Sequence, residues 1–151
     1  VIGWTTTIFG ILLYISDKNE ISNKMQNNFT YKSALLIGMF QILSLIPGVS
    51  RSGIAISAAR ILKFNRVDSA KISFLLSIPI LGAVTIFGLN NLVMNDNINF
   101  SSLNMLSIFF SFLFSYISIK FFLKYMKKFD LKIFVFYRII LGSILLFFAY
   151  L

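Results

Sequence analysis

The sequence contains no cysteine and no histidine. Without cysteine the chain can form no disulfide and has no thiolate for catalysis or metal binding. Without histidine it lacks the commonest general base near neutral pH and the commonest metal ligand. Acidic residues are also scarce, with five Asp and Glu in 151 residues. The chain therefore offers few groups for proton transfer, and it contains no set of residues that predicts a metal site.

Charged residues of both signs are sparse, at 13% of the chain against about 25% in an average soluble domain. Hydrophobic residues make up 58%, whereas soluble domains reach about 45–50% even when glycine is counted. A chain of this composition has too little polar surface to enclose its apolar residues in water. Lipid must therefore form part of its surroundings, and the composition predicts an integral membrane protein.

The net charge of +9 raises the alternative of nucleic-acid binding. The basic residues, however, lie in short segments between apolar stretches, at residues 18–32, 60–71 and 120–132. This distribution is typical of topology signals that face anionic lipid headgroups. We therefore expect membrane lipids and no nucleic acid as partners, with all three basic segments in the cytoplasm.

The apolar stretches predict an all-α, polytopic helical bundle in one membrane domain, residues 1–151. A helix crosses the bilayer with about 20 residues. Residues 72–94, 100–119 and 133–151 qualify as complete spans, whereas residues 1–16 form a partial span. The chain begins with Val1, without a basic region before its first apolar run. We therefore expect an amino-terminal part to be missing.

Residues 33–62 differ from the other stretches. Residues 33–46 would form about 21 Å of helix, which is short of the roughly 30 Å of hydrocarbon. Pro47 and Gly48 then interrupt the helix, and a second short apolar segment follows. A single span here would place two basic segments on opposite faces of the membrane. The pattern instead predicts a re-entrant helix-loop-helix hairpin over residues 33–62, which is tolerated only where it lines a protein-walled cavity.

The hairpin tip combines residue types that bind phosphate. Gly48 and Gly53 allow backbone amides to converge, and the helix that follows presents its amino terminus to an anion. Ser50 and Ser52 add hydroxyls, and Arg51 adds a planar fork suited to phosphate oxygens. The predicted catalytic residues are Ser50 and Arg51, and the predicted substrate-binding residues are Gln41, Gly48, Ser52 and Gly53.

Two arginines lie in apolar surroundings and receive different interpretations. Placing Arg51 within the membrane costs about 2.5–3.5 kcal/mol unless a polar cavity receives it, so a functional role is favoured. The alternative is an interfacial turn from which Arg51 reaches the headgroups. Arg138 lies close to the basic segment before it, and we expect its side chain to extend to the cytoplasmic end as a structural residue.

The string Pro-Gly-Val-Ser-Arg-Ser-Gly at residues 47–53, preceded by Gly38 and Gln41, closely resembles the second conserved motif of undecaprenyl-diphosphate phosphatases, the bacitracin-resistance proteins. Residues 73–79 and the pair Tyr137-Arg138 also fall where that family has similar residues. Two positions depart from the pattern. Val49 stands where the family often has threonine, and Ala55 stands where a threonine commonly follows the motif.

The resemblance implies a fold of two inverted repeats, of which this chain would hold the second, preceded by the last helix of the first. It implies hydrolysis of polyprenyl diphosphate to the monophosphate for cell-wall lipid-carrier recycling, in the inner (plasma) membrane. The family's glutamate-rich motif and histidine belong to its first half. The implied divalent cation, Mg²⁺ or Ca²⁺, would therefore have ligands outside this chain, which we expect to be inactive alone.

Other functions stay open at this stage. Broken half-helices with a charged tip also serve transporters and lipid flippases of anionic substrates. A decayed, non-catalytic remnant is a third alternative. Besides the lipid substrate, the partners considered are the missing amino-terminal repeat and a second copy of the chain in a homodimer.

Overall fold

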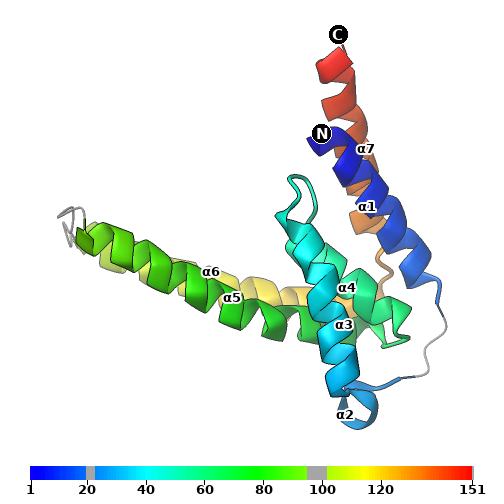
Figure 1. The fold of residues 1–151 in the computed structure, drawn as a ribbon, viewed down its shortest axis with the longest axis horizontal. Helices are drawn as coiled ribbons and strands as arrows, with labels where there is room; N and C mark the ends of the chain where they lie inside the picture. The colour runs from blue at the N-terminus through cyan, green and yellow to red at the C-terminus, as the bar shows by residue number, and fades with distance from the viewer. Residues whose placement is uncertain (20–22, 95–101, 151) are drawn as a thin grey trace.

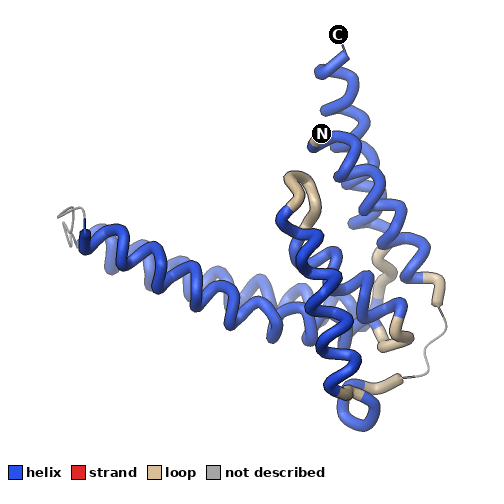
Figure 2. Tube along the Cα trace, in the orientation of Figure 1, coloured by secondary structure: helices blue, strands red, loops and turns tan. Residues whose placement is uncertain are grey.

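The computed structural model describes residues 1–19, 23–94 and 102–150, and every named element in these ranges is a helix (Figure 2). In chain order these are α1 (Ile2–Asp17), α2 (Met25–Asn28), α3 (Tyr31–Ile42), the 3₁₀ turn η1 (Leu43–Leu45), α4 (Arg51–Ile61), α5 (Arg66–Met94), α6 (Ser102–Lys128) and α7 (Lys132–Tyr150). Within these ranges, three helical segments are long and apolar enough to cross a membrane: Arg66–Asn90, Asn104–Lys128 and Lys132–Tyr150. The predicted all-α membrane class is confirmed.

The three long helices differ from the predicted spans at their ends. α5 begins at Arg66 because Asn65 caps it: Asn65 Oδ1 accepts a hydrogen bond from the Asp68 amide at 2.7 Å. α6 continues to Lys128, beyond the predicted limit at residue 119. The positive charges of Lys127 and Lys128 in its last turn interact favourably with the negative end of the helix dipole. Residues 95–101, between α5 and α6, lie outside the described residues.

The helices form two diverging arms with a helical hairpin between them (Figure 1). α1 packs along α7 in one arm, and α5 packs on α6 in the other. α4 lies at the junction, where it contacts α1, α3 and α5. The helix that positions the predicted motif is therefore held by both arms.

Residues 33–62 do not form one helix. α3 and α4 run side by side in opposite directions, joined by η1 and residues 46–50 (Figure 1). The chain also enters and leaves this hairpin at the same end, because the Met25 amide donates to Asp68 Oδ2 at 3.0 Å. The break that the sequence predicts is present, with its tip at the motif.

Arg60, at the base of the hairpin, does not face solvent or headgroups as expected from its place in a basic segment. Its side chain is buried, with 2% exposure. It donates hydrogen bonds to the carbonyl oxygens of Asp17, Asn19 and Phe64 at 2.7–2.9 Å, and it pairs with the Asp17 carboxylate at 3.3 Å. The ends of α1 and α4 leave carbonyls without helical partners, and Arg60 satisfies them.

A second set of ion pairs joins the other helix ends at this base. Arg66 donates to both carboxylate oxygens of Asp17, at 2.8 and 3.0 Å, and also pairs with Asp130. Lys132 lies 3.4 Å from the Asp130 carboxylate. The ends of α1 and α6 and the starts of α5 and α7 therefore meet at one end of the molecule, which brings basic segments 60–71 and 120–132 together.

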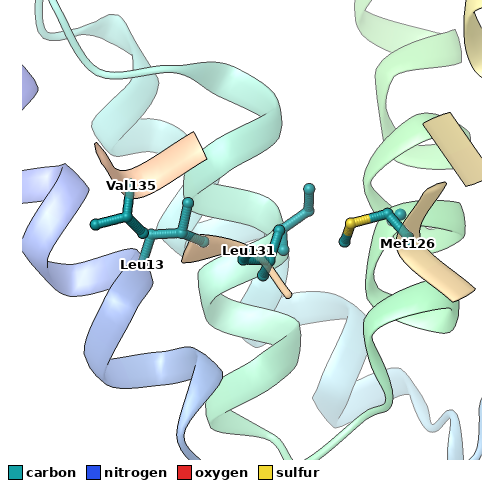
Figure 3. Close-up of a cluster of buried hydrophobic side chains, with 6 residues drawn as sticks. Leu13, Met126, Leu131 and Val135 are labelled. Carbon is teal, nitrogen blue, oxygen red and sulfur yellow. The ribbon is translucent and has the colours of Figure 1, made fainter. Parts of the chain in front are cut away.

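Two apolar clusters lie beside α4. One joins α1, α4, α5, α6 and α7 through Leu13, Ile56, Ala70, Met126, Leu131 and Val135 (Figure 3). The other places Ile37 of α3 and Ile72 of α5 against small residues of α4, at positions 55, 58 and 59. Small side chains allow close helix approach, so α4 packs between its neighbours at short range.

Candidate functional site

The tip of the hairpin requires glycine at position 48. Gly48 has a φ of +94°, a conformation that residues with a Cβ rarely adopt. A Cβ here would also collide with Thr5 Oγ1 and lie 2.9 Å from the Ile2 carbonyl oxygen. Thr5 Oγ1 donates to the Pro47 carbonyl at 2.7 Å, and Thr6 Oγ1 lies 3.4 Å from the Gly48 carbonyl. α1 therefore fixes the tip through hydroxyls that sequence reasoning did not single out.

Helix α4 begins at the tip with Ser50 as its cap. The Ser50 side chain accepts a hydrogen bond from the Gly53 amide at 3.2 Å, and its oxygen lies 3.3 Å from Ser52 Oγ. The amides of Arg51 and Ser52 precede the first backbone bond of α4, so they have no partner within the helix. The predicted residues Ser50, Arg51 and Ser52 therefore lie together around an electropositive helix end.

A polar cavity of about 470 Å³, here called the tip pocket, opens beside this helix end. Its walls comprise Ser44, Val49, Arg51, Ser52, Ser73, Phe74 and Ser77. Ser73 donates to the Ser52 carbonyl at 3.3 Å, and Ser77 donates to the Phe74 carbonyl at 2.6 Å. These two serines, one helical turn apart on α5, join the predicted residues and were identified in the sequence only through the family resemblance.

Gln41 lies in a neighbouring cavity of about 390 Å³ that Arg51 also lines. The side chain of Gln41 is 6% exposed, and its Oε1 has no hydrogen-bond partner. A buried amide oxygen without a partner costs about 1–3 kcal/mol. The structure therefore brings Gln41 and Arg51 to one cavity and leaves the amide oxygen of Gln41 available to a polar ligand.

The prediction for Arg138 was wrong. Its guanidinium does not extend to the end of α7 but lies against Gly53, where an added Cβ would be 2.5 Å from Nη2 and 2.7 Å from Nη1. α7 packs closely on α1 at Gly10, whose added Cβ would lie 3.3 Å from Arg138 Cβ. This packing turns the arginine toward the first turn of α4. Gly53 thus makes room for a guanidinium rather than only for converging amides.

The site carries uncompensated positive charge. Arg51 belongs to the first turn of α4, and Arg138 lies against the same turn. Among residues 1–19, 23–94 and 102–150, neither arginine forms an ion pair, whereas Arg60 and Arg66 at the base do. Two cations, a helix amino terminus and several hydroxyls together form a site for an anion with several oxygens, such as a phosphate.

The same residues do not suit a divalent cation. The described part of the chain contains no group of three His, Cys, Asp or Glu side chains that would hold a metal ion. The walls of the tip pocket supply serine hydroxyls and an arginine, whereas Mg²⁺ and Ca²⁺ prefer carboxylate and carbonyl oxygens. The site can bind and stabilise negative charge, but it has no carboxylate or imidazole to activate a nucleophile.

Ala55, which stands where the family commonly has threonine, lies away from the tip pocket. Ala55 is 1% exposed and belongs to the buried cluster with Ile37 and Ile72. Its side chain is not a wall of the tip pocket. The missing hydroxyl at this position is therefore accommodated by apolar packing between α3, α4 and α5.

The chain matches the family model described as bacitracin resistance protein BacA over residues 1–144. It is 51% identical over 150 residues to an undecaprenyl-diphosphatase from Pelagibacter ubique. The aligned residues cover 99% of this chain and 58% of that relative. Undecaprenyl-diphosphatases from Campylobacter curvus and Aliivibrio salmonicida are 45% and 44% identical over 147 residues, or 97% of this chain and 55% of each relative. The chain thus spans little more than half the length of these relatives.

Proposed function

The chain belongs to the bacitracin resistance protein BacA family, and from this membership and the site geometry we propose that the whole protein hydrolyses undecaprenyl diphosphate to undecaprenyl phosphate. The proposed location is the inner (plasma) membrane, where this lipid carrier would be recycled for cell-wall synthesis. The names of the relatives favour hydrolysis over transport of an anionic lipid.

The observation that carries this proposal is the pair of arginines at the first turn of α4. Arg51 lines the tip pocket, and Arg138 lies over Gly53, both without an ion-pair partner in the described ranges. Buried or membrane-embedded cations without carboxylates are costly unless a ligand supplies the opposite charge. A diphosphate attached to a membrane lipid brings that charge to this depth.

We assign binding roles to the residues at the tip. Arg51 holds the terminal phosphate through its planar fork, and the free amides of the first turn hold further oxygens. The hydroxyl of Ser50 accepts from the Gly53 amide, which leaves its proton for a phosphate oxygen. Negative charge that develops during phosphoryl transfer is stabilised by these donors, which are in place before substrate arrives.

Activation of the attacking group falls to residues outside this chain. The tip carries no carboxylate or imidazole among its described residues. A general base, and the ligands of any divalent cation, must therefore come from another segment. We propose that an amino-terminal repeat supplies both and completes the enzyme. These 151 residues alone would then bind a diphosphate without hydrolysing it.

Phosphate release from undecaprenyl diphosphate by the purified full-length protein in detergent tests this function. We expect release by the wild type and a loss of about 100-fold or more in the Arg51→Ala variant, because one charge-stabilising donor is removed. Lys71→Ala serves as the control, since Lys71 is an exposed base of α5 and is not a wall of the tip pocket or of the Gln41 cavity. Undiminished release by well-folded Arg51→Ala protein would refute the assignment.

A further inference from the structure

A groove runs from the tip pocket along the gap between α3 and α5. The tip pocket and the Gln41 cavity share Ser44 and Arg51 as walls. The Gln41 cavity in turn shares Leu76 and Pro79 with a third cavity, of about 240 Å³, nearer the hairpin base. Three successive cavities therefore form one path, here called the α3–α5 groove.

The groove changes from polar to apolar along its length. Its first part contains the Arg51 guanidinium and the serine hydroxyls of the tip pocket. Gln41 lies in the middle part, with its amide oxygen buried and without a partner. The last part is lined by apolar side chains, among them Phe29, Ile37 and Ile72. This order matches a ligand with an anionic head and a long apolar tail.

Position 38, rather than the small residues of α4, leaves space in the groove wall. The alanines of α4 at positions 55, 58 and 59 pack with Ile37 and Ile72 in a buried cluster and line none of the three cavities. Gly38 forms part of the wall, and a Cβ placed there would meet no atom within 4 Å. A side chain at position 38 would therefore extend into the groove rather than into the protein.

We propose that the α3–α5 groove binds the isoprenoid units next to the diphosphate, and that Gln41 contacts the junction between head and tail. This inference rests on the proposed function, because it takes a polyprenyl diphosphate as the ligand. The cation at one end selects an anionic head, and the continuous apolar walls bind a tail that is attached to it. A free phosphate would occupy the tip pocket and leave the rest of the groove empty.

Filling the groove tests the proposal in the full-length protein. The Gly38→Phe variant should raise the KM for undecaprenyl diphosphate about tenfold or more, because the ring occupies space meant for the tail. Inhibition by inorganic diphosphate should change by less than about twofold, since this ligand has only the head. Gly82→Phe is the matched control. Gly82 is exposed on α5 outside the groove walls, and a Cβ added to it also meets no atom within 4 Å. An unchanged KM in Gly38→Phe, or an equal loss of diphosphate inhibition, would overturn the proposal.

A labelling experiment separates this inference from the hydrolytic function. Cysteine is absent from all 151 residues, so Gly38→Cys and Gly82→Cys can be labelled with maleimide and read by mass spectrometry of the peptide concerned. A non-hydrolysable polyprenyl methylenediphosphonate should slow labelling at position 38 and leave position 82 unaffected. Protection at position 38 by this analogue, combined with no phosphate release from undecaprenyl diphosphate in the separate assay, would refute the proposed hydrolysis and leave the groove proposal standing. Equal protection by bilayer phospholipid without the diphosphonate would identify the occupant as a membrane lipid and refute the groove proposal.

Discussion

The guanidinium of Arg138 lies directly against Gly53, close enough that a Cβ on this glycine would come within 2.9 Å of Nη1, Nη2 and Cζ. The two residues belong to the last and the central helix of the chain, α7 and α4. Their contact places a second positive charge at the first turn of α4. The glycine of the motif and the distant arginine therefore form one structural unit.

Gly53→Ala should lower phosphate release about tenfold to 100-fold in the full-length protein, because a displacement of the guanidinium by about 1 Å misplaces a charge-stabilising group. The atoms that the new methyl group meets are the far end of a flexible side chain, so the fold is retained. Thermal unfolding in detergent should show little change. Gly82→Ala is the control, and equal activity of the two variants would contradict the role of this contact.

Substitution of Arg138 by lysine tests whether the planar fork is needed. Arg138→Lys should lower kcat/KM about tenfold, because an ammonium group does not reproduce the paired donors of a guanidinium. Arg138→Met should lower it further, by about 100-fold. If the side chain only bound lipid headgroups at the membrane surface, lysine would replace it without loss of activity. The kcat/KM of Arg138→Lys would then equal that of the wild type.

Thr5 is expected to act as a positioning residue for the tip. Thr5→Val removes the hydroxyl that donates to the Pro47 carbonyl at 2.7 Å and keeps the side-chain shape. We expect kcat to fall about twofold to tenfold, since one hydrogen bond contributes about 0.5–1.5 kcal/mol, with KM changed less. Thr5→Ser should restore the rate.

Thr7→Val is the matched control for this position. The Thr7 hydroxyl bonds within α1, to the Gly3 carbonyl at 2.9 Å, and the structure shows no bond from it to the tip. Its loss should leave kcat unchanged. A fall in kcat of the same size in both variants would show that α1 stability, rather than the position of the tip, limits the reaction.

Arg60→Ala should destabilise the protein without altering the chemistry of the tip. Its removal leaves the Asp17 and Asn19 carbonyls without this donor, the Phe64 carbonyl with only the 3.5 Å contact from Ser69 Oγ, and part of the Asp17 charge unpaired; breaking a buried pair costs about 3–5 kcal/mol. A large fall in the unfolding temperature in detergent is the expected result, and activity per folded molecule should persist. Lys71→Ala, on the exposed face, should unfold like the wild type.

The local features of this fold were accessible from the sequence. The Pro47-Gly48 break and the two short helices around it depend on neighbouring residues, and the structure contains each of them. The same holds for the grouping of Ser50, Arg51 and Ser52, because consecutive residues at a helix start must lie together.

Contacts between distant helices were not accessible in this way. Whether Arg138 extends to the membrane surface or turns inward depends on the close packing of α7 on α1, which no local pattern reveals. Arg60 resembled a surface base because sequence position does not show which carbonyls lack donors. Thr5 lies in an apolar run, and its bond to Pro47 spans 42 positions of the chain.

The tip of the hairpin takes its contacts from both arms. Thr5 and Arg138 approach it from α1 and α7, and Ser73 reaches the Ser52 carbonyl from α5. Within residues 1–19, 23–94 and 102–150, the ion pairs that connect the arms lie at the base, around Asp17 and Asp130. One arm thus holds the tip through Thr5 and the other through Ser73, so the geometry of the phosphate site depends on the angle between two helix pairs.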